Sequence, residues 1–484
     1  MESVYDKYEA VIGLEVHTQL VTKSKAYCSD INEFGSRPNT NIGPVSLGLP
    51  GTLPKANTNT INFAIRLGLA IGARITTKMH YDRKNYFYPD LPKGYQITQD
   101  RTPICTGGYV SIKTDDGSPK DVAITRIHME EDAGKSIHDQ DIYDTLVDLN
   151  RAGVPLLEIV SEPEIKSSKE AYNYLQEVRK LVRYLDICDG NLEEGSMRCD
   201  ANISVMLKGS TEFGERCEVK NMNSMRNVQR AIDHEIKRQI DIIESGGSIS
   251  MQTRSFDAVS GTTSLMRSKE EAHDYRYFPE PDLQPLEISQ EYISSIEKKM
   301  PPLPKSLFEK YTTQFGLSEY DALNLTESKD IALFFEGISE LTKNYKAAAN
   351  WVMGSIKSYL NQKAIDITEF PIAPKKIVEI IELVDNGKIV NSTAEQRLFP
   401  EMIRNPEKSA EELSEANGWL IQTDSSELTE LINSILNENP NELERLKSGE
   451  KKLIGFFMGQ IMKASRGSAN PKEVTKIISE LIEQ

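Results

Sequence analysis

Ser196-Met197-Arg198-Cys199-Asp200-Ala201-Asn202-Ile203-Ser204-Val205 is the stretch that decides the fold. Apolar and polar residues alternate along it, so each kind occupies one face of an extended strand. The segment from Ala10 to Leu20 repeats the pattern. Its apolar members are Leu14, Val16 and Leu20, and its polar members are Glu15, His17 and Gln19. Strands that bury one face and present a charged one are typical of antiparallel sheets.

Two helical patterns interrupt these strands. Ser167 or Ser168 is suited to cap a helix whose apolar stripe runs from Tyr172 to Leu185. A second helix spans Val228 to Ile243 and ends at Gly246-Gly247, because glycine readily adopts the left-handed conformation that closes a helix. We therefore expect an α+β fold with a largely antiparallel sheet.

The 484 residues are too many for one ordinary hydrophobic core, so several domains are expected. The texture changes near Met300-Pro301-Pro302-Leu303-Pro304, after which helical patterns prevail, and from about residue 408 the chain becomes more polar. We expect an N-terminal α+β domain over residues 1–290, an all-α domain over 291–407 and a small all-α domain over 408–484.

The composition, with 38% hydrophobic and 27% charged residues, is that of a globular protein. No stretch approaches the roughly 20 apolar residues of a membrane helix, and the N-terminus lacks the apolar core of a signal peptide. The five cysteines are scattered, so we expect a cytoplasmic protein without disulfides. The net charge of −16 argues against a protein that coats nucleic acid, but it leaves room for a local basic patch that grips a folded RNA.

Carboxylates and imidazoles gather in two short motifs. Glu15-Val16-His17 places two metal-binding side chains on one strand face, although a polar pair on a solvated face has the same pattern. His128-Met129-Glu130-Glu131-Asp132 concentrates three acids at a strand end, where solvated turns also carry acids. Strict alternation points Glu130 and Glu131 to opposite faces, so both serve one site only if the strand has already ended.

Acids and bases are interleaved on the polar faces of two further strands. Asp200 shares its face with Arg198, and Glu218 lies between Arg216 and Lys220. A nucleotide–magnesium site needs this combination, because acids hold the metal and cations balance the phosphates. Further cations that would serve are Arg83, Lys84 and Lys93.

Two other patterns do not carry chemistry. Gly134-Lys135-Ser136 copies the end of a phosphate-binding P-loop, but that motif requires glycine where Met129 stands. The neighbouring acids would also repel phosphate, so we reject a P-loop. Cys199 lies on the apolar face of its strand, and we expect a buried structural thiol rather than a nucleophile.

Longer motifs recur through nearly the whole chain. They are Val11 to His17, Arg83 to Asp90, His128 to Lys135, Val147 to Arg151, Glu193 to Asn202, Lys220 to Ser224, Asp274 to Asp282 and Gly459 to Ser465. These segments closely resemble the B subunits of the glutamyl-tRNA(Gln)/aspartyl-tRNA(Asn) amidotransferases, the GatB family of the GatCAB enzymes.

The resemblance implies a cradle domain, a helical domain and a YqeY-like tail that contacts the body of the tRNA. It also implies a reaction in which ATP, with Mg²⁺, phosphorylates the side-chain carboxylate of a mischarged glutamyl- or aspartyl-tRNA. Ammonia released from glutamine by a partner A subunit then displaces the phosphate. The third component of such complexes is a small C subunit, which contacts the other two.

The same resemblance implies roles for individual residues. Those that would gather the magnesium ions are Glu15, His17, Glu131 and Glu218, with Glu130 and Asp200 nearby. Those that would meet the phosphates of ATP are Lys84, Arg198 and Lys220. Lys93 and Glu131 resemble a pair at the outlet of the ammonia channel, and we take them as the catalytic pair.

The chain departs from the family in one place. Many members carry a four-cysteine zinc knuckle just after the first strand. Here Cys28 remains, while Asp30, Gly43 and Ser46 occupy the other positions. One thiolate does not make a tetrahedral structural site, so we expect no zinc.

Two other interpretations compete with this one. The E subunit of the related two-component enzyme has a synthetase-like domain between cradle and helical domain, whereas here Asp282-Leu283 leads directly into the helical region. A noncatalytic tRNA-binding scaffold would use Glu15, His17 and Glu131 only structurally. ATP-dependent phosphate release separates a catalyst from such a scaffold. Which tRNA is amidated depends on the synthetases that mischarge it.

Overall fold

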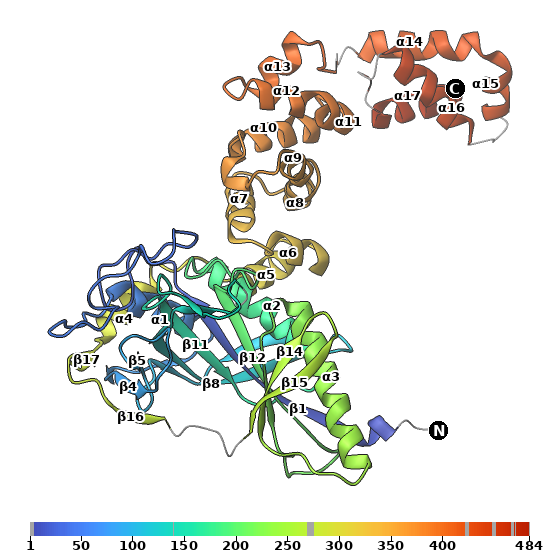
Figure 1. Ribbon diagram of the computed structural model, residues 1–484. Coiled ribbons are helices and arrows are strands. Elements are labelled where there is room, and N and C mark those ends of the chain that lie inside the picture. Colours follow the sequence, from blue (N-terminus) through green and yellow to red (C-terminus); the bar gives the residue numbers. More distant parts are fainter. Residues whose placement is uncertain are drawn as a thin grey trace. The chain divides into compact units, whose positions relative to one another are not determined.

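The computed structural model describes residues 4–138, 140–268, 275–421, 425–447, 452–465, 469 and 471–483. The chain forms two compact units, Met1–Leu303 and Pro304–Gln484, and each is described by itself. Figure 1 shows that the strands belong to the first unit and that the second is helical. The predicted α+β fold is confirmed.

A ten-stranded sheet organises the first unit. Its strand order is β15-β14-β13-β12-β1-β11-β8-β6-β2, with β7 paired to β8. The strands are β1 (Tyr8–Gln19), β2 (Arg74–Ile75), β6 (Cys105–Thr106), β7 (Tyr109–Lys113), β8 (Pro119–Glu131), β11 (Pro155–Ser161), β12 (Met197–Leu207), β13 (Cys217–Lys220), β14 (Gln252–Asp257) and β15 (Thr262–Ser268). Neighbouring strands are antiparallel except β13 and β14, which are parallel. The sheet is therefore largely antiparallel, as predicted.

The two strands that the alternating pattern predicts are direct neighbours at the centre of this sheet. In β1 and β12, Val16 is opposite Cys199 and His17 is opposite Arg198. Leu14, Val16 and Cys199 are buried in the core of the unit, which leaves the opposite face for the polar side chains.

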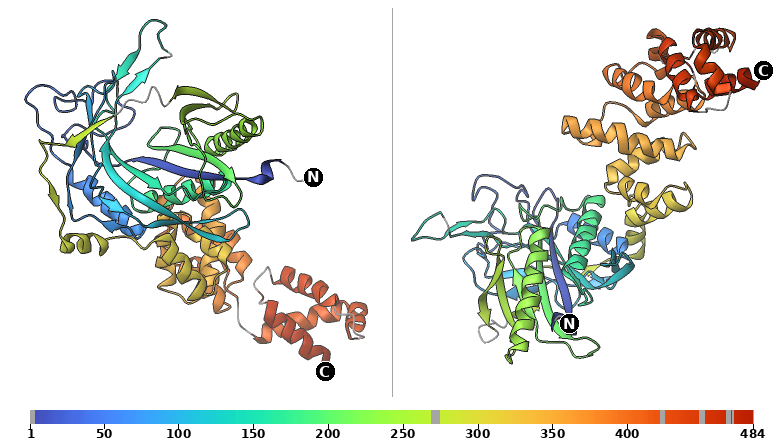
Figure 2. Two further views of the ribbon diagram at one scale, coloured as in Figure 1. Left: turned by 90° about the horizontal axis from the view of Figure 1, so that it is seen from below. Right: turned by 90° about the vertical axis from the view of Figure 1, so that its right-hand side faces the viewer.

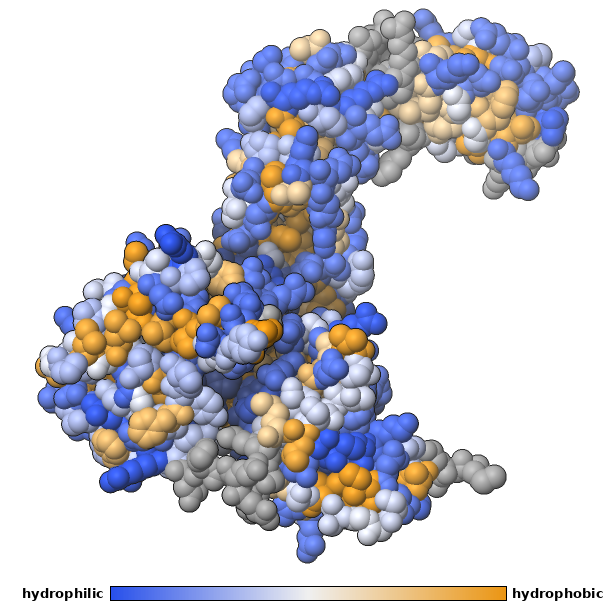
Figure 3. Space-filling view, in the orientation of Figure 1, coloured by the Kyte–Doolittle hydropathy of each residue, from blue (hydrophilic) through white to orange (hydrophobic). Residues whose placement is uncertain are grey.

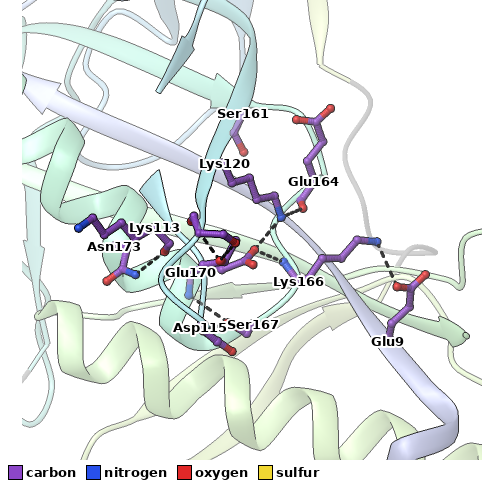
Figure 4. Close-up of polar contacts among 12 residues, drawn as sticks. Glu9, Lys113, Asp115, Lys120, Ser161, Glu164, Lys166, Ser167, Glu170 and Asn173 are labelled. Atoms are coloured by element: carbon purple, nitrogen blue, oxygen red, sulfur yellow. Dashed lines mark hydrogen bonds and ion pairs between the residues drawn. The ribbon is translucent and has the colours of Figure 1, made fainter. Parts of the chain in front are cut away.

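Helices α1 (Thr58–Ala70), α2 (Ser168–Tyr184) and α3 (Met225–Glu244) cover the apolar face. Ser167 caps α2 by accepting a hydrogen bond from the backbone N–H of Glu170 at 3.0 Å, as predicted. The side chain of Glu170 is held by Lys120 at 2.7 Å, and Figure 4 shows both residues at this helix end. The other predicted helix, α3, ends at Glu244 with Ser245 as its C-cap, and Gly246 follows with a φ of +79°.

Small sheets complete the first unit. They pair β3 (Lys78–Met79) with β17 (Leu286–Glu287), β4 (Asp82–Asn85) with β5 (Tyr95–Thr98) and β16 (Arg276–Pro279), and β9 (Lys135–Ile137) with β10 (Leu146–Asp148). Helix α4 (Gln290–Glu297) follows, and its Ile293 and Ile296 are buried in the same core. The compact unit thus ends at Leu303, beyond the expected boundary at 290, because α4 packs on α1. Asp274, the first residue of one quoted motif, lies outside the described residues.

The second unit consists of short helices. They are α5 (Pro304–Thr313), α6 (Glu319–Leu325), α7 (Lys329–Ser339), α8 (Tyr345–Trp351), α9 (Lys357–Lys363), α10 (Pro374–Asp385), α11 (Asn391–Thr393), α12 (Phe399–Arg404) and α13 (Ala410–Ala416). Ala410 and Leu413 of α13 are buried, and the backbone N–H of Ile421 donates to the carbonyl of Lys388 just after α10. The packing of the helical body thus continues through Ile421.

Four last helices pack as a small bundle, visible in both views of Figure 2. They are α14 (Ser425–Glu438), α15 (Pro440–Lys447), α16 (Leu453–Ala464) and α17 (Pro471–Glu483). Ile432, Phe457, Ile461 and Ile478 form the centre of a hydrophobic cluster that is separate from the core of the sheet unit. We therefore propose that the tail begins after Ile421 rather than at 408.

Across the described residues, no helix is both long enough and apolar enough to cross a membrane.

Candidate active site

The register of four strands aligns charged side chains in a row across the polar face of the sheet. His17 in β1 is opposite Arg198 in β12 and opposite Glu158 in β11, and Glu158 is opposite His128 in β8. Two residues further along, Glu15 is opposite Asp200. Residues distant in sequence thus meet because antiparallel pairing fixes which side chains are neighbours.

The first cluster joins two imidazoles to two carboxylates. Nε2 of His17 lies 3.2 Å from Glu158 and 3.6 Å from Glu130, and Nε2 of His128 lies 3.3 Å and 3.6 Å from the same two carboxylates. His17, Glu130 and Glu158 each offer one ligand atom, and these three atoms all lie within 4.8 Å of one another. Nitrogen and oxygen donors at this spacing suit a divalent cation.

The electrostatics of this cluster favour a positive charge at its centre. Burial alone would lower the pKa of both imidazoles, but the hydrogen bonds and charge of Glu158 outweigh it. The pKa of His17 is raised, and that of His128 is raised to about 9. Burial would raise the pKa of Glu158, yet the two imidazoles hold it well below its ordinary value. A bound cation would stabilise the ionised carboxylates in the same way.

The second cluster is built from three carboxylates and a lysine. Ligand oxygens of Glu15, Asp200 and Glu218 all lie within 4.8 Å of one another. Nζ of Lys220 donates to Asp200 at 2.5 Å and to Glu218 at 2.8 Å. Burial, then the charges of Glu158, Glu218 and Asp200, raise the pKa of Glu15. The oxygen-rich donor set fits Mg²⁺, which prefers carboxylates and water.

Polar neighbours fix the orientation of these carboxylates. Asn202 donates to Glu15 at 2.9 Å, and Thr253 in β14 donates to Glu218 at 2.9 Å. Such outer partners determine which oxygen faces an ion.

The structure does not bring the predicted ligand Glu131 to either cluster. Strand β8 continues through Glu131, so Glu130 and Glu131 point to opposite faces. The carboxylate of Glu131 instead forms an ion pair with Lys93, and its Oε1 accepts a hydrogen bond from the backbone N–H of Ile97 at 2.9 Å. Glu131 and Lys93 are thus neighbours, as the family resemblance implies, and both side chains are buried.

The three predicted phosphate-binding cations have different surroundings. Lys220 holds the second cluster, and Asp200 and Glu218 raise its pKa despite burial. Arg198 donates to Asp132 at 2.8 Å. Nζ of Lys84 lies 4.5 Å from the centroid of the Tyr275 ring and forms no ion pair within the described part of the chain. Arg83 is instead fully engaged by Glu280 and Asp282.

Two sequence exclusions are confirmed. Lys135 and Ser136 belong to the short strand β9, so the P-loop-like triplet does not precede a helix. Cys199 is 2% exposed, and burial raises the pKa of its thiol. It is a buried residue of the sheet, and its raised pKa makes the thiol a poor nucleophile.

The sequence patterns did not predict that Glu158 and His128 belong to the first cluster. Glu158 stands alone within the apolar run Pro155-Leu156-Leu157-Glu158-Ile159-Val160, where a carboxylate is costly unless it has a partner. An isolated acid in an apolar strand was the sequence feature that could have identified Glu158 as a site residue.

Comparison with known proteins first gives the class. Residues 10–294 match the family model of the GatB/GatE catalytic domain, and residues 333–482 match that of the GatB domain. The chain is 49% identical to the B subunit of an aspartyl/glutamyl-tRNA(Asn/Gln) amidotransferase from Thermodesulfovibrio yellowstonii, covering 99% of this chain and 100% of the relative. The corresponding protein from Persephonella marina is 47% identical, with 98% and 100% covered, and that from Geobacter sulfurreducens is 48% identical, with 97% and 98% covered. The chain belongs to the GatB family.

Proposed function

We propose that this chain is the B subunit of a tRNA-dependent amidotransferase. It activates the side-chain carboxylate of glutamyl-tRNA(Gln) or aspartyl-tRNA(Asn) by phosphoryl transfer from ATP. The observation that carries the proposal is the pair of carboxylate clusters, His17/Glu130/Glu158 and Glu15/Asp200/Glu218, side by side on one sheet face. The names of the relatives, B subunits of aspartyl/glutamyl-tRNA(Asn/Gln) amidotransferases, support the substrate.

The chemistry explains why ATP is needed. A carboxylate is a poor acyl donor because its leaving group would be oxide. Transfer of the γ-phosphoryl group converts it to an acyl phosphate and releases ADP. Ammonia then attacks the carbonyl carbon, phosphate departs, and the side chain becomes an amide. A sheltered site limits hydrolysis of the acyl phosphate before ammonia arrives.

The oxygen donors of the second cluster fit Mg²⁺, and the mixed nitrogen and oxygen donors of the first suit a divalent cation. The residues that would hold it are Glu15, Asp200 and Glu218 in one cluster and His17, Glu130 and Glu158 in the other. Bound Mg²⁺ would supply stabilisation of the charge on the transferring phosphoryl group. Lys220, Arg198 and Lys84 would orient the phosphates of ATP, which substrate positioning requires.

Glu131 and Lys93 take a separate role in this proposal. They form a buried ion pair, and Glu131 points to the face of β8 opposite the face that carries Glu130 and the two clusters. We assign them to the path by which ammonia reaches the activated carboxylate, and we place Glu131 with Lys93 rather than with the metal ligands.

Exposed apolar side chains on the loops after β1 would contact the partner subunits. Ile31, Phe34, Leu49 and Leu53 are between 48% and 72% exposed. In Figure 3 hydrophobic colour gathers over the upper left of the sheet unit, where Figure 1 draws these dark-blue loops. Apolar patches of this kind mark interaction surfaces. We propose that this chain assembles with the glutaminase A subunit and a small C subunit, in the cytoplasm where aminoacyl-tRNA is used.

Isotope transfer in the reconstituted complex tests the function directly. Glutamyl-tRNA(Gln) and aspartyl-tRNA(Asn) are prepared with ¹⁸O in the side-chain carboxylate and incubated with ATP, Mg²⁺ and glutamine. One ¹⁸O should appear in inorganic phosphate for each amide formed. Phosphate without ¹⁸O would exclude an acyl phosphate, and a complex that releases no ATP-dependent phosphate would make this chain a scaffold.

A further inference from the structure

A cavity of about 640 Å³ lies in the sheet unit, on the side of the sheet that the helices cover. Its walls include the start of β1, the first turn of α2, the end of β12 and one side of α3. A volume of this size is typical of sites for small ligands. At roughly 3.3 Å per residue, Tyr8 at the cavity and Glu15 in the second metal cluster are about 23 Å apart along β1. The cavity is therefore separate from the site described above.

The deepest residues of the cavity are apolar. Ala10 and Ile240 are 6% and 2% exposed, and Ile236 is half-buried one turn before Ile240 on α3. Tyr8 also lines the cavity, and its hydroxyl donates to Glu244 at 2.9 Å, which fixes the orientation of the ring. An aromatic ring above an apolar floor suits the flat ring of a ligand, because such rings stack on aromatic side chains.

Lysines from three elements surround this floor. Lys166 and Lys169 stand on either side of the first residues of α2, Lys208 follows β12, and Lys237 belongs to α3. Lys169, Lys208 and Lys237 are exposed and form no ion pair with any carboxylate that the structure describes. Their ammonium groups repel one another, and an anion between them would relieve that repulsion.

The carboxylates at the cavity do not cancel this charge. Glu9 lies 3.8 Å from Nζ of Lys166, and Asp115 accepts a hydrogen bond from Oγ of Ser167 at 3.0 Å, as Figure 4 shows. Asp233, one turn before Lys237 on α3, is the third acid of the lining. Four lysines thus face three carboxylates, of which two already have partners. The cavity carries an excess of positive charge on a chain whose net charge is −16.

We propose that this cavity binds a nucleotide, with its phosphate among Lys169, Lys208 and Lys237 and its base on the floor beside Tyr8. Ammonium groups donate strong, charge-assisted hydrogen bonds to phosphate oxygens. Two sources supply this chemistry, namely a free nucleotide such as ATP and a nucleotide within the bound tRNA. The tRNA source rests on the proposed function, whereas the free nucleotide does not.

The test is a double variant of the full chain, Lys208→Met with Lys237→Met, in the A–B–C complex. Its melting temperature should be unchanged, because both lysines are exposed and substitutions at such positions are usually neutral. Equilibrium dialysis with the nonhydrolysable analogue β,γ-imido-ATP and Mg²⁺ counts the nucleotides bound per complex. If the ligand is a free nucleotide, the wild type binds one more than the double variant.

Filter binding of glutamyl-tRNA(Gln) and aspartyl-tRNA(Asn) across a salt series tests the other source. If the tRNA supplies the nucleotide, the analogue counts agree and the double variant binds tRNA more weakly. Its salt slope should then be lower by roughly 0.7–0.9 for each lost phosphate contact. Tyr8→Leu should weaken the same binding without changing the salt slope, because it removes the stacking ring and no positive charge.

Lys113→Met is the matched control. Lys113 is an exposed lysine of β7 near α2, where its carbonyl accepts from Nδ2 of Asn173 at 2.7 Å, and its side chain does not line the cavity (Figure 4). Nucleotide count, tRNA affinity and salt slope should all match the wild type. If the double variant does not assemble, Lys169→Met is measured in the same way.

Two results overturn the proposal. One is a double variant that equals the wild type in nucleotide count, tRNA affinity and salt slope. The other is a loss of the same size in Lys113→Met, which would reflect only the general loss of positive charge. A wild-type complex that amidates neither tRNA would refute the proposed function instead, and a nucleotide count that depends on Lys208 and Lys237 would still support the cavity as a nucleotide site.

Discussion

The buried charges of this protein are concentrated in the sheet unit and are rare in the helical unit. Nearly all of the described charged side chains that are buried belong to the first unit. They are Lys25, Asp82, His128, Glu130, Glu131, Asp132, Glu170, Glu235 and Glu280, and Asp321 is their counterpart in the second unit. Most of the described ion pairs in the helical unit have at least one exposed side chain, and in Lys388–Glu411 the two side chains are 50% and 51% exposed.

Buried and exposed charges interact with anions differently. Buried charges are costly and need fixed partners, but their interactions are strong because water is excluded. Exposed charges contribute little to stability and remain free to meet a polyanion. The first arrangement suits phosphoryl transfer, and the second suits a grip on the body of a tRNA.

Removing one carboxylate from the first cluster should give the largest effect. In Glu158→Gln the side chain keeps its shape but no longer offers negative charge to His17, His128 or a cation. Metal stabilisation of a transferring phosphoryl group is worth several kcal/mol, so ATP-dependent phosphate release should fall by about 100-fold or more. Binding of Mn²⁺, followed by electron paramagnetic resonance, should weaken in parallel.

Glu131→Gln is the matched comparison on the opposite face of β8. It should leave Mn²⁺ binding unchanged and impair amidation, because Glu131 is paired with Lys93. If Glu131→Gln weakened Mn²⁺ binding as strongly as Glu158→Gln, the division into two metal clusters and a separate ammonia path would be wrong.

Deleting the tail should give the next largest effect. The exposed lysines of this region include Lys447, Lys452, Lys463 and Lys476. The sequence also places Lys451 and Arg466 there, outside the described residues, and Lys472, whose side chain is not described. Truncation after Ile421 preserves the packing of α13 on α10. We expect tRNA binding to weaken about tenfold or more, with a salt slope lower by roughly 0.7–0.9 for each lost phosphate contact.

Filter binding of mischarged tRNA across a salt series measures this change. Glutamine hydrolysis that does not require tRNA should persist, since the sheet unit and its apolar loops remain. Equal affinity of the truncated and full complexes would show that the exposed lysines are only solubilising charges.

Local patterns predicted much of this structure, and long-range pairing explains what they missed. Alternation predicted β1 and β12, and capping and apolar spacing predicted α2 and α3. The same alternation warned that Glu130 and Glu131 face opposite ways. It did not reveal that Glu158 joins His17, because that contact depends on β11 pairing with β1. Neither did it reveal that α4 packs on the sheet unit, since its polar and apolar spacing resembles that of the helices that follow.

A pH series should sharpen the contrast between buried and exposed ion pairs. Glu235 is 0% exposed and accepts hydrogen bonds from Arg238 at 2.6 Å and Gln239 at 2.9 Å. Burial would raise its pKa, but these bonds hold the pKa below the ordinary value of 4.5. Its stabilisation is therefore fully present above pH 4.5 and is lost as pH falls through the lower folded value. Glu235→Gln should cost roughly 1.5–3 kcal/mol at pH 7 and progressively less below pH 4.5.

The two tryptophans provide an internal control for that experiment. Trp351 and Trp419 both lie in the helical unit. Urea unfolding followed by tryptophan fluorescence should therefore be insensitive to Glu235→Gln, while tyrosine fluorescence should report the loss in the sheet unit. Lys388→Met, at an exposed pair, should change the tryptophan transition by less than about 1 kcal/mol at any pH. A pH-independent penalty in Glu235→Gln would refute the assigned charge state.

Removal of zinc should give the smallest effect, namely none. The positions that correspond to the family's zinc knuckle still meet in space, but hydrogen bonds join them. Oδ2 of Asp30 accepts from Oγ of Ser46 at 2.8 Å and from the backbone N–H of Gly43 at 2.7 Å, and Sγ of Cys28 lies 3.3 Å from Ser46. Burial raises the pKa of Cys28, which keeps its thiol protonated and a poor zinc ligand. A Cβ at Gly43 would lie 2.3 Å from the Asp30 carboxylate, so a larger residue at position 43 would clash with Asp30.

We therefore expect no stoichiometric zinc in elemental analysis and an unchanged melting temperature with chelator. Asp30→Ala should lower the melting temperature because it removes the acceptor of both hydrogen bonds. About one zinc per chain, as a structural site would hold, would contradict this account and make Asp30 a metal ligand.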